Sequence, residues 1–156
     1  MALSDRDIIR AINKREIAIE PFNLENLTPN GYDLTVKEIK IGERTGEEAV
    51  EKTRIPKSEW FVISTQEVIK LGLDYAGEIW IRSTYARRGV FGSFGVVDAG
   101  FEGELTLPFF NSHSPLELKK GDKIVQVVFK KLDSTAFSSY KEKSGKFMHQ
   151  RGITLD

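Results

Sequence analysis

The sequence contains no cysteine and only two histidines among its 156 residues. The absence of cysteine excludes disulfide bonds, thiolate nucleophiles and zinc sites with cysteine ligands. His113 and His149 are too few to build an ordinary histidine-based catalytic zinc site. Any chemistry of this chain must therefore proceed without a thiolate and without a protein-bound zinc ion of the usual kind.

Neither sign of charge is in excess, because 23 basic residues balance 23 acidic ones. A neutral chain has no bulk field that favours duplex nucleic acid or an anionic membrane, so a polyanionic ligand needs a local cluster of donors. Long hydrophobic runs are also missing: none approaches the ~20 residues of a membrane span, and the first residues lack the apolar core of a signal peptide. We expect a soluble, cytoplasmic protein with neither nucleic acid nor a membrane as its partner.

Many short apolar segments separated by turn residues predict a series of β-strands with little helix. One short helix is expected near the N-terminus, where Ser4 precedes apolar residues at helical spacing. We also interpret residues 66–71 as one helical turn and residues 42–57 as an exposed polar loop. The length suits one domain over residues 1–156, with an all-β fold of the barrel or jelly-roll type. The Ser-, Lys- and Gly-rich segment 133–156 is expected to be a mobile tail.

The most informative stretch begins where the alternating segment 78–81 ends. Arg82, Ser83 and Arg87 lie at this strand end, where their donors can converge on an anion. Three glycines follow within residues 89–95, and a backbone without side chains can approach a planar ligand closely.

Two further residues complete the stretch. Asp98 follows a short apolar run, and Phe101 lies at the tip of the next turn. A carboxylate in this position can orient a water molecule and take its proton during attack on phosphorus. Anion donors, a close-approach hairpin, one carboxylate and one ring together indicate a nucleotide pocket.

Five segments of the chain resemble the core motifs of the dUTPase and dCTP deaminase superfamily, which are trimeric enzymes acting on pyrimidine deoxynucleoside triphosphates. They are residues 30–34 (NGYDL), 82–87 (RSTYAR), 98–103 (DAGFEG), 121–126 (GDKIVQ) and 146–152 (KFMHQRG). Each segment is weak evidence by itself, but five ordered matches along nearly the whole chain make chance a poor explanation. The resemblance implies the distorted β-barrel (β-clip) of that superfamily and a homotrimer that shares its sites between subunits.

The resemblance also implies a role for each matched residue. Asp98 matches the aspartate that activates the water cleaving between the α and β phosphates. Mg²⁺ is the implied cofactor, held mainly by substrate phosphates and waters without a direct protein ligand, and Asp33 is the residue that would contact it through a water. Substrate binding, with the tail closing over the triphosphate, is implied for Arg82, Ser83, Thr84, Arg87, Gly95, Val96, Phe101, Gln126, Tyr140, Lys146 and Gln150.

Three of these residues have a purely structural alternative. Asp98 could cap its own turn, as aspartates before glycine-containing turns often do. Phe101 could be an ordinary core ring, since the chain has ten phenylalanines. Asp33 could satisfy the turn amides that follow Gly31.

The two branches of the superfamily differ in one acid. In the deaminase branch, a glutamate ten residues after the motif aspartate shuttles protons while water attacks C4 of cytosine. The same count from Asp98 reaches Pro108, which cannot transfer a proton, and Glu104 on the same strand face would lie ~13 Å away. We therefore predict a dUTP diphosphatase that forms dUMP and diphosphate. A dCTP deaminase, including a bifunctional one, and a non-enzymatic nucleotide-binding barrel stay open as alternatives.

Overall fold

The computed structural model describes residues 1–42, 47–48 and 52–156 of the chain. Helix α1 (Asp5–Asn13) begins after Ser4, whose hydroxyl accepts a hydrogen bond from the Asp7 amide. Its buried side chains, Ile8 and Ala11, belong to the same apolar core cluster as the buried residues of the strands. The expected N-terminal helix is confirmed.

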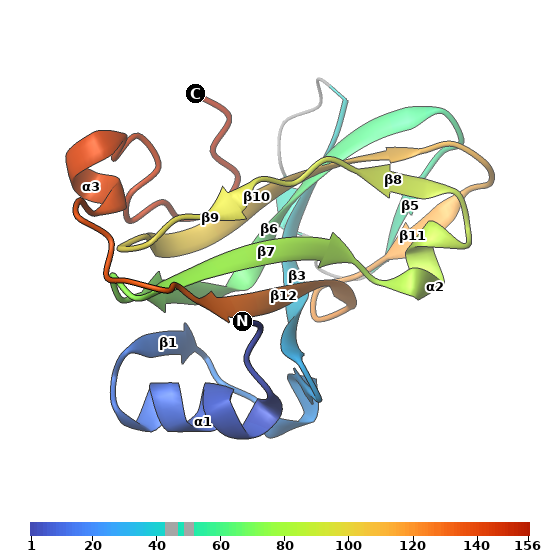
Figure 1. The fold of residues 1–156 in the computed structure, drawn as a ribbon. Helices are drawn as coiled ribbons and strands as arrows, with labels where there is room; N and C mark the ends of the chain where they lie inside the picture. Colours follow the sequence, from blue (N-terminus) through green and yellow to red (C-terminus); the bar gives the residue numbers. More distant parts are fainter. Residues whose placement is uncertain (43–46, 49–51) are drawn as a thin grey trace.

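Strands dominate the rest of the described chain (Figure 1). The remaining helical segments are short: η1 (Leu24–Asn26), α2 (Ser83–Ala86) and α3 (Tyr140–Lys143). The strands are β1 (Ile17–Glu20), β2 (Leu27–Thr28), β3 (Gly31–Ile41), β4 (Glu47–Glu48), β5 (Thr53–Ile55), β6 (Glu59–Leu71), β7 (Tyr75–Ile81), β8 (Val90–Gly92), β9 (Val96–Val97), β10 (Glu102–Asn111), β11 (Leu116–Leu118) and β12 (Lys123–Lys131).

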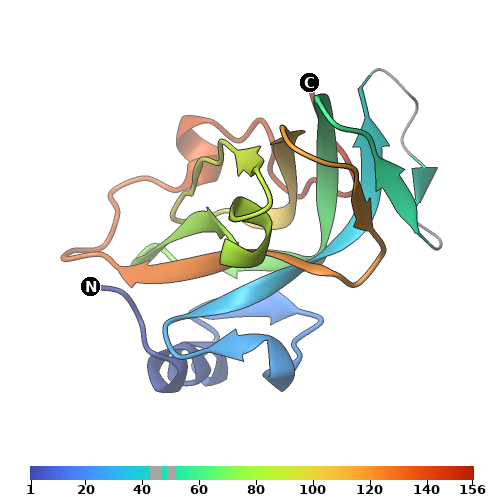
Figure 2. The ribbon, with the colours of Figure 1, turned by 90° about the vertical axis from the view of Figure 1, so that its right-hand side faces the viewer.

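One large sheet, in the order β8-β10-β6-β3-β12-β7-β9, forms the body of the molecule. Its first and last strands, β8 and β9, are joined by residues 93–95 alone. So short a connection brings the two ends of the sheet together, which curls the sheet around its apolar face, as Figure 2 shows. The predicted all-β fold is confirmed, and the glycine-rich hairpin of the sequence is the link that closes it.

Several register shifts bend the long strands. The apolar residues of β3 change phase between Val36 and Ile39, which predicts a bulge. The structure confirms it, because the pairing with β6 shifts between Val36 and Glu38 and leaves Lys37 as the extra residue. A larger bulge on β6 sets residues 65–67 opposite Leu105 alone. Such bulges bend a strand and redirect neighbouring side chains.

The helical turn proposed for residues 66–71 is wrong. These residues are the end of β6, which pairs with β1 on one side and with β10 on the other. The buried, half-buried and exposed positions alternate from Gln66 to Leu71 as in a strand, so pairing on both edges overrode a short helical pattern.

The polar segment 42–57 is only partly a loop. Residues 43–46 and 49–51 of this segment lie outside the described residues. Its end forms β5, which pairs with β11 in a separate small sheet and buries Ile55.

The core lies inside the curl of the large sheet. Its largest fully buried rings are Tyr32, Phe61, Phe109 and Phe129, and Phe61 stacks on Phe109 at a centroid distance of 5.1 Å. Phe94, from the hairpin link, packs edge-on against Phe109 at 5.0 Å and so anchors the link to the core. None of the helices in the described part of the chain is long and apolar enough to cross a membrane.

Candidate functional site

A pocket of about 260 Å³ opens beside the closing hairpin, between β9, β10 and the C-terminal segment. Its floor is apolar, and aromatic rings form part of its wall. Asp98 is the only acidic residue among the described residues that line it. The lining residues are Ile79, Gly95, Val96, Val97, Asp98, Phe101, Leu105, Thr106, Leu107, Tyr140, Phe147 and Gln150.

Asp98 stands at the end of β9, directly after the buried Val97. Its backbone carbonyl accepts the Phe101 amide at 3.1 Å, which closes the turn, while its side chain is exposed. The turn is thus held by the backbone, and no hydrogen bond within the described residues engages the Asp98 carboxylate. This carboxylate is available to orient a water molecule at the pocket mouth.

Phe101 belongs both to the core and to the pocket. Its ring is buried and packs edge-on against Tyr140 at a centroid distance of 5.4 Å. The Tyr140 amide donates to the Ala99 carbonyl at 2.8 Å, which fixes this contact at the start of α3. The ring therefore has an apolar setting that suits contact with a sugar and does not require it.

The C-terminal segment supplies one wall of the pocket (Figure 1, where α3 and the chain end lie over β9 and β10). The Tyr140 hydroxyl accepts the Phe147 amide at 3.1 Å, and the Gln150 side-chain amide donates to the Glu104 carbonyl at 2.6 Å. Lys146 is different, because it is exposed and lies 5.0 Å above the Phe147 ring rather than in the pocket lining. The structure thus brings Tyr140 and Gln150, but not Lys146, to the pocket.

The predicted phosphate-binding residues form a second group, the basic cluster, at the far end of β7. Arg82 Nε lies 3.3 Å from Asp33 Oδ2, and Arg82 Nη1 donates to the Lys123 carbonyl at 3.2 Å. Gln126 is the cross-strand partner of Asp33 and donates to Thr28 Oγ1 at 2.6 Å. The exposed members of the basic cluster are Ser83, Thr84 and Arg87 on and beside α2.

Asp33 is buried in the basic cluster. Burial raises the pKa of its carboxyl above the ordinary value, while the positive charges of Arg82 and Lys123 act in the opposite direction. A buried carboxylate beside a guanidinium fixes the orientation of that guanidinium. Within the described residues, no group of three or more His, Asp or Glu side chains is arranged to hold a metal ion.

The pocket and the basic cluster are separated within one chain. Val97 pairs with Gly77 on β7, and Arg82 follows five residues further along the same strand direction. At the rise of an extended strand, Gly77 and Arg82 are about 16 Å apart along β7, so the two groups lie far from each other in one protomer. The pocket and the basic cluster are called the two half-sites.

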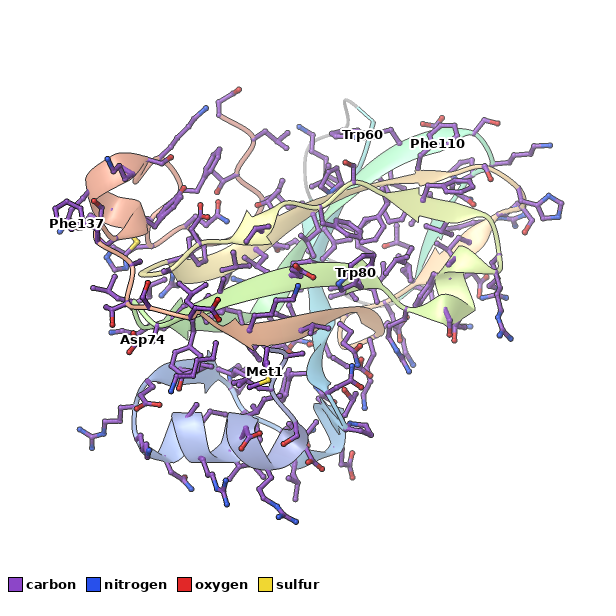
Figure 3. All side chains as sticks on the ribbon, viewed as in Figure 1. Met1, Trp60, Asp74, Trp80, Phe110 and Phe137 are labelled. Atoms are coloured by element: carbon purple, nitrogen blue, oxygen red, sulfur yellow. The ribbon has the colours of Figure 1, made fainter. Side chains whose placement is uncertain are left out.

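Large apolar side chains are exposed beside both half-sites. Trp80, which is 59% exposed, lies on β7 between them. Val96, also 59% exposed, pairs across the β7–β9 ladder with Glu78, two residues before Trp80. Trp60 and Phe110 are paired across β6 and β10 and lie together on the surface in Figure 3. Exposed apolar surface of this extent is typical of a protein interface.

Sequence reasoning missed several residues of the pocket. Thr106 and Leu107 follow the matched motif on β10, and Phe147 is next to the matched Lys146. Side chains alternate along β10, so Thr106 is predicted to lie on the same face as Glu104 and could have been found. Nothing local to Asp33 or Arg82 signals their ion pair, which joins positions far apart in the chain.

The fold is that of the dUTPase and dCTP deaminase class of β-clip proteins. The crystal structure of 2'-deoxycytidine 5'-triphosphate deaminase from Agrobacterium tumefaciens matches 83% of this chain with a TM-score of 0.73, at 14% sequence identity and over 48% of its own length. A dUTPase from Staphylococcus bacteriophage 80alpha matches 80% of this chain and 96% of its own with a TM-score of 0.56, at 16% identity.

The chain belongs to the dCTP deaminase-like family, whose model matches residues 2–132. A protein named dCTP deaminase from Pyrococcus furiosus is 44% identical over 131 residues, which is 82% of this chain and 84% of that protein. A protein named probable deoxyuridine 5'-triphosphate nucleotidohydrolase from Sulfolobus islandicus rod-shaped virus 1 is 35% identical over 157 residues, covering 99% of this chain and 98% of its own. The relatives thus carry both names of the superfamily.

Proposed function

We propose that the protein is a dUTP diphosphatase, which hydrolyses dUTP to dUMP and diphosphate. In this reaction a water oxygen bonds to the α-phosphorus while the bond from that phosphorus to the bridging oxygen breaks. Asp98 takes the proton of the water, and diphosphate leaves with the bridging oxygen. The apolar pocket holds the deoxyribose and the pyrimidine, with Phe101 beneath the sugar and the backbone at Gly95 and Val96 beside the base.

The observation that carries this proposal is the presence of one carboxylate, Asp98, among the described residues of the pocket lining. Water attack on phosphorus needs one general base. Deamination also needs a proton-donating acid beside the cytosine ring. Pro108 stands where the resemblance places that acid. Glu104 cannot replace it, because its carboxylate binds Lys37 Nζ at 2.9 and 3.0 Å and accepts the Gly152 amide.

The basic cluster binds the triphosphate in this proposal. Arg82 is held by Asp33 and keeps its outer N–H donors for phosphate oxygens, with Ser83, Thr84 and Arg87 beside it. Mg²⁺ suits this arrangement, since it keeps its waters and is bound mostly through substrate phosphates. When bound, the ion neutralises charge on the departing diphosphate.

The separation of the half-sites supports a homotrimer. Asp98 and Arg82 of one chain are too far apart to act on one triphosphate, so the pocket of one subunit must meet the basic cluster of a neighbour. The exposed Trp80 and Val96 beside both half-sites offer the apolar surface for that contact.

A dCTP deaminase is the second candidate, favoured by the name of the 44% identical relative. The two candidates release different products from different substrates. The purified protein is incubated with Mg²⁺ and either dUTP or dCTP, and diphosphate and ammonia are measured separately. Diphosphate from dUTP without ammonia from dCTP is the expected result; stoichiometric ammonia from dCTP overturns the assignment, and no product from either nucleotide favours a non-enzymatic barrel.

A further inference from the structure

Three successive backbone amides near the C-terminus donate to side chains of the barrel. The Gly152 amide donates to Glu104 Oε2 at 2.5 Å, the Ile153 amide to Glu38 Oε2 at 2.9 Å, and the Thr154 amide to Thr106 Oγ1 at 3.0 Å. An extended tail that merely lay on the surface would leave such amides to water. Here each amide has its own acceptor, and two of the acceptors are carboxylates, which make the stronger hydrogen bonds.

The two carboxylates are also held by side chains of the sheet. Glu104 is buried and bound by Lys37 Nζ, while Glu38 accepts the Ser64 hydroxyl at 2.8 Å. Lys37 and Glu38 are adjacent in sequence, and the bulge in β3 at Lys37 allows both side chains to lie near the C-terminal segment. The sheet therefore holds the acceptor side chains in position, and the C-terminal segment does not have to order them.

Gly152 fits this contact in a way that another residue would not. Its φ is +64°, in the left-handed region that favours glycine. A Cβ at this position would lie 2.7 Å from Glu38 Oε2, closer than a real contact allows. The backbone conformation therefore favours glycine here, and a Cβ would displace the Glu38 carboxylate from its present position.

The same segment carries a pocket residue. The Glu104 amide donates to the Gln150 carbonyl at 3.0 Å, and the Gln150 side chain returns a hydrogen bond to the Glu104 carbonyl. This two-way pairing uses the outer edge of β10 at Glu104, which β8 leaves open because it pairs only with residues 109–111. Anything that fixes residues 152–154 on the barrel thus also fixes Gln150 against the pocket.

We propose that Glu104 and Glu38, supported by Lys37, form a latch that holds the C-terminal segment on its own subunit without nucleotide. They are positioning residues: they act on the pocket through Gln150 and Phe147 and do not touch substrate. The latch itself does not depend on which nucleotide the protein hydrolyses. Only its effect on KM rests on the proposed function.

The test compares hydrogen exchange of the full-length nucleotide-free protein with that of Glu104→Gln and Gly152→Ala. Glu117→Gln is the matched control, since its exposed carboxylate pairs with Lys52 on the opposite part of the molecule. We expect the amides of residues 152–154 to be protected in the wild type and in Glu117→Gln. In both latch variants they should exchange at least about tenfold faster, while β12 amides keep their protection and show that the barrel is folded.

Two results overturn the latch. One is exchange of residues 152–154 at unprotected rates in the wild type, and the other is unchanged exchange in both Glu104→Gln and Gly152→Ala. The kinetic readout is separate: the variants should raise the KM for dUTP with little change in kcat, because Gln150 loses its fixed position while Asp98 is untouched. If the protein hydrolyses no dUTP, the exchange result still decides the latch, so the two failures can be told apart.

Discussion

Asp33 and Arg82 form an ion pair in which the Asp33 carboxylate is buried and the Arg82 guanidinium remains partly exposed. The guanidinium is gripped at two of its nitrogens, by Asp33 at Nε and by the Lys123 carbonyl at Nη1. Because this grip already orders the long Arg82 side chain, the side chain would lose less conformational entropy when it binds phosphate. The pair gives Asp33 a role that sequence reasoning had not considered, beside the predicted contact with Mg²⁺ through a water.

The Asp33→Asn variant distinguishes these two roles. If Asp33 positions Arg82, the variant should raise the KM for dUTP about tenfold, because the neutral amide leaves Arg82 unpaired and mobile. The Mg²⁺ concentration for half-maximal activity should then stay the same. Steady-state kinetics against dUTP and against Mg²⁺ measure both quantities, with the exposed Asp5→Asn as control. A Mg²⁺ requirement that rises in Asp33→Asn, with an unchanged KM, supports the water-mediated metal contact instead.

Asp98→Asn tests the proposed base. The amide keeps the size and hydrogen bonding of the carboxylate but cannot accept the proton, and the loss of a general base typically costs ~10²–10⁴ in rate. Substrate binding should survive, because the basic cluster and Mg²⁺ hold the triphosphate. Turnover is compared with affinity for a non-hydrolysable dUTP analogue measured by calorimetry. A folded variant that turns over within a few fold of the wild type would show that Asp98 only ends its strand.

Subunit mixing tests the shared site. Asp98→Asn and Arg82→Ala should each be nearly inactive alone. When the two are unfolded together and refolded, about a quarter of the interfaces should combine a wild-type Asp98 with a wild-type Arg82 under random assortment. Activity should therefore return to about that fraction of the wild type, and sedimentation should show a trimer. Sites built within one chain would give no recovery, since every chain carries a defect.

The elements that sequence predicted well are those with local signals. Ser4 marks the start of α1, and the phase change after Val36 marks the bulge in β3, because caps and alternation are properties of neighbouring residues. The strand at residues 66–71 was missed because its pairing with β1 and β10 has no local signature.

The same distinction holds for the candidate site. Gly95 and Asp98 stand out in one short stretch, so their place beside a pocket could be predicted. The latch around Glu104 could not, since Glu104 meets Lys37 and Gly152, which are both distant from it in sequence. The latch and the predicted mobility of segment 133–156 exclude each other for residues 152–154, and hydrogen exchange decides between them; the closure of the segment over a triphosphate stays a prediction.

Glu67 links stability to pH. Its buried carboxylate accepts the Thr35 amide at 2.9 Å and the Thr35 hydroxyl at 2.7 Å. Burial raises the pKa of Glu67, and the hydrogen bonds from Thr35 oppose this only in part. The folded state thus holds the proton more tightly than the unfolded state, so Glu67 favours folding more as pH falls from the folded pKa toward the ordinary glutamate value.

The Glu67→Gln variant removes this pH-dependent contribution to the free energy of unfolding while keeping an acceptor for Thr35. We expect the Tm of the wild type, compared with that of the variant, to rise as the pH falls from neutral toward the ordinary glutamate pKa, and to be constant at pH values well above the folded pKa. Each tenfold difference in proton affinity between the two states corresponds to about 1.4 kcal/mol. Thermal unfolding of both proteins at several pH values measures the difference, and a difference that is flat from pH 4 to pH 8 contradicts the raised pKa.

Pro108→Glu asks whether one acid restores deamination. Pro108 lies in β10 opposite Val62, and the surface around it is mostly apolar, with the Trp60 indole and the Ser93 hydroxyl as the side-chain donors among its described lining residues. A proton shuttle must be held within about half an ångström of its working position by supporting contacts, and this surface supplies few of them. We therefore expect no ammonia from dCTP above background, while dUTP hydrolysis continues because Asp98 and the basic cluster are unchanged. Pro108→Gln, of the same size and without the acid, is the control. Ammonia from dCTP with Pro108→Glu but not with Pro108→Gln would mean that the absence of a glutamate at this position is by itself what separates this chain from a deaminase.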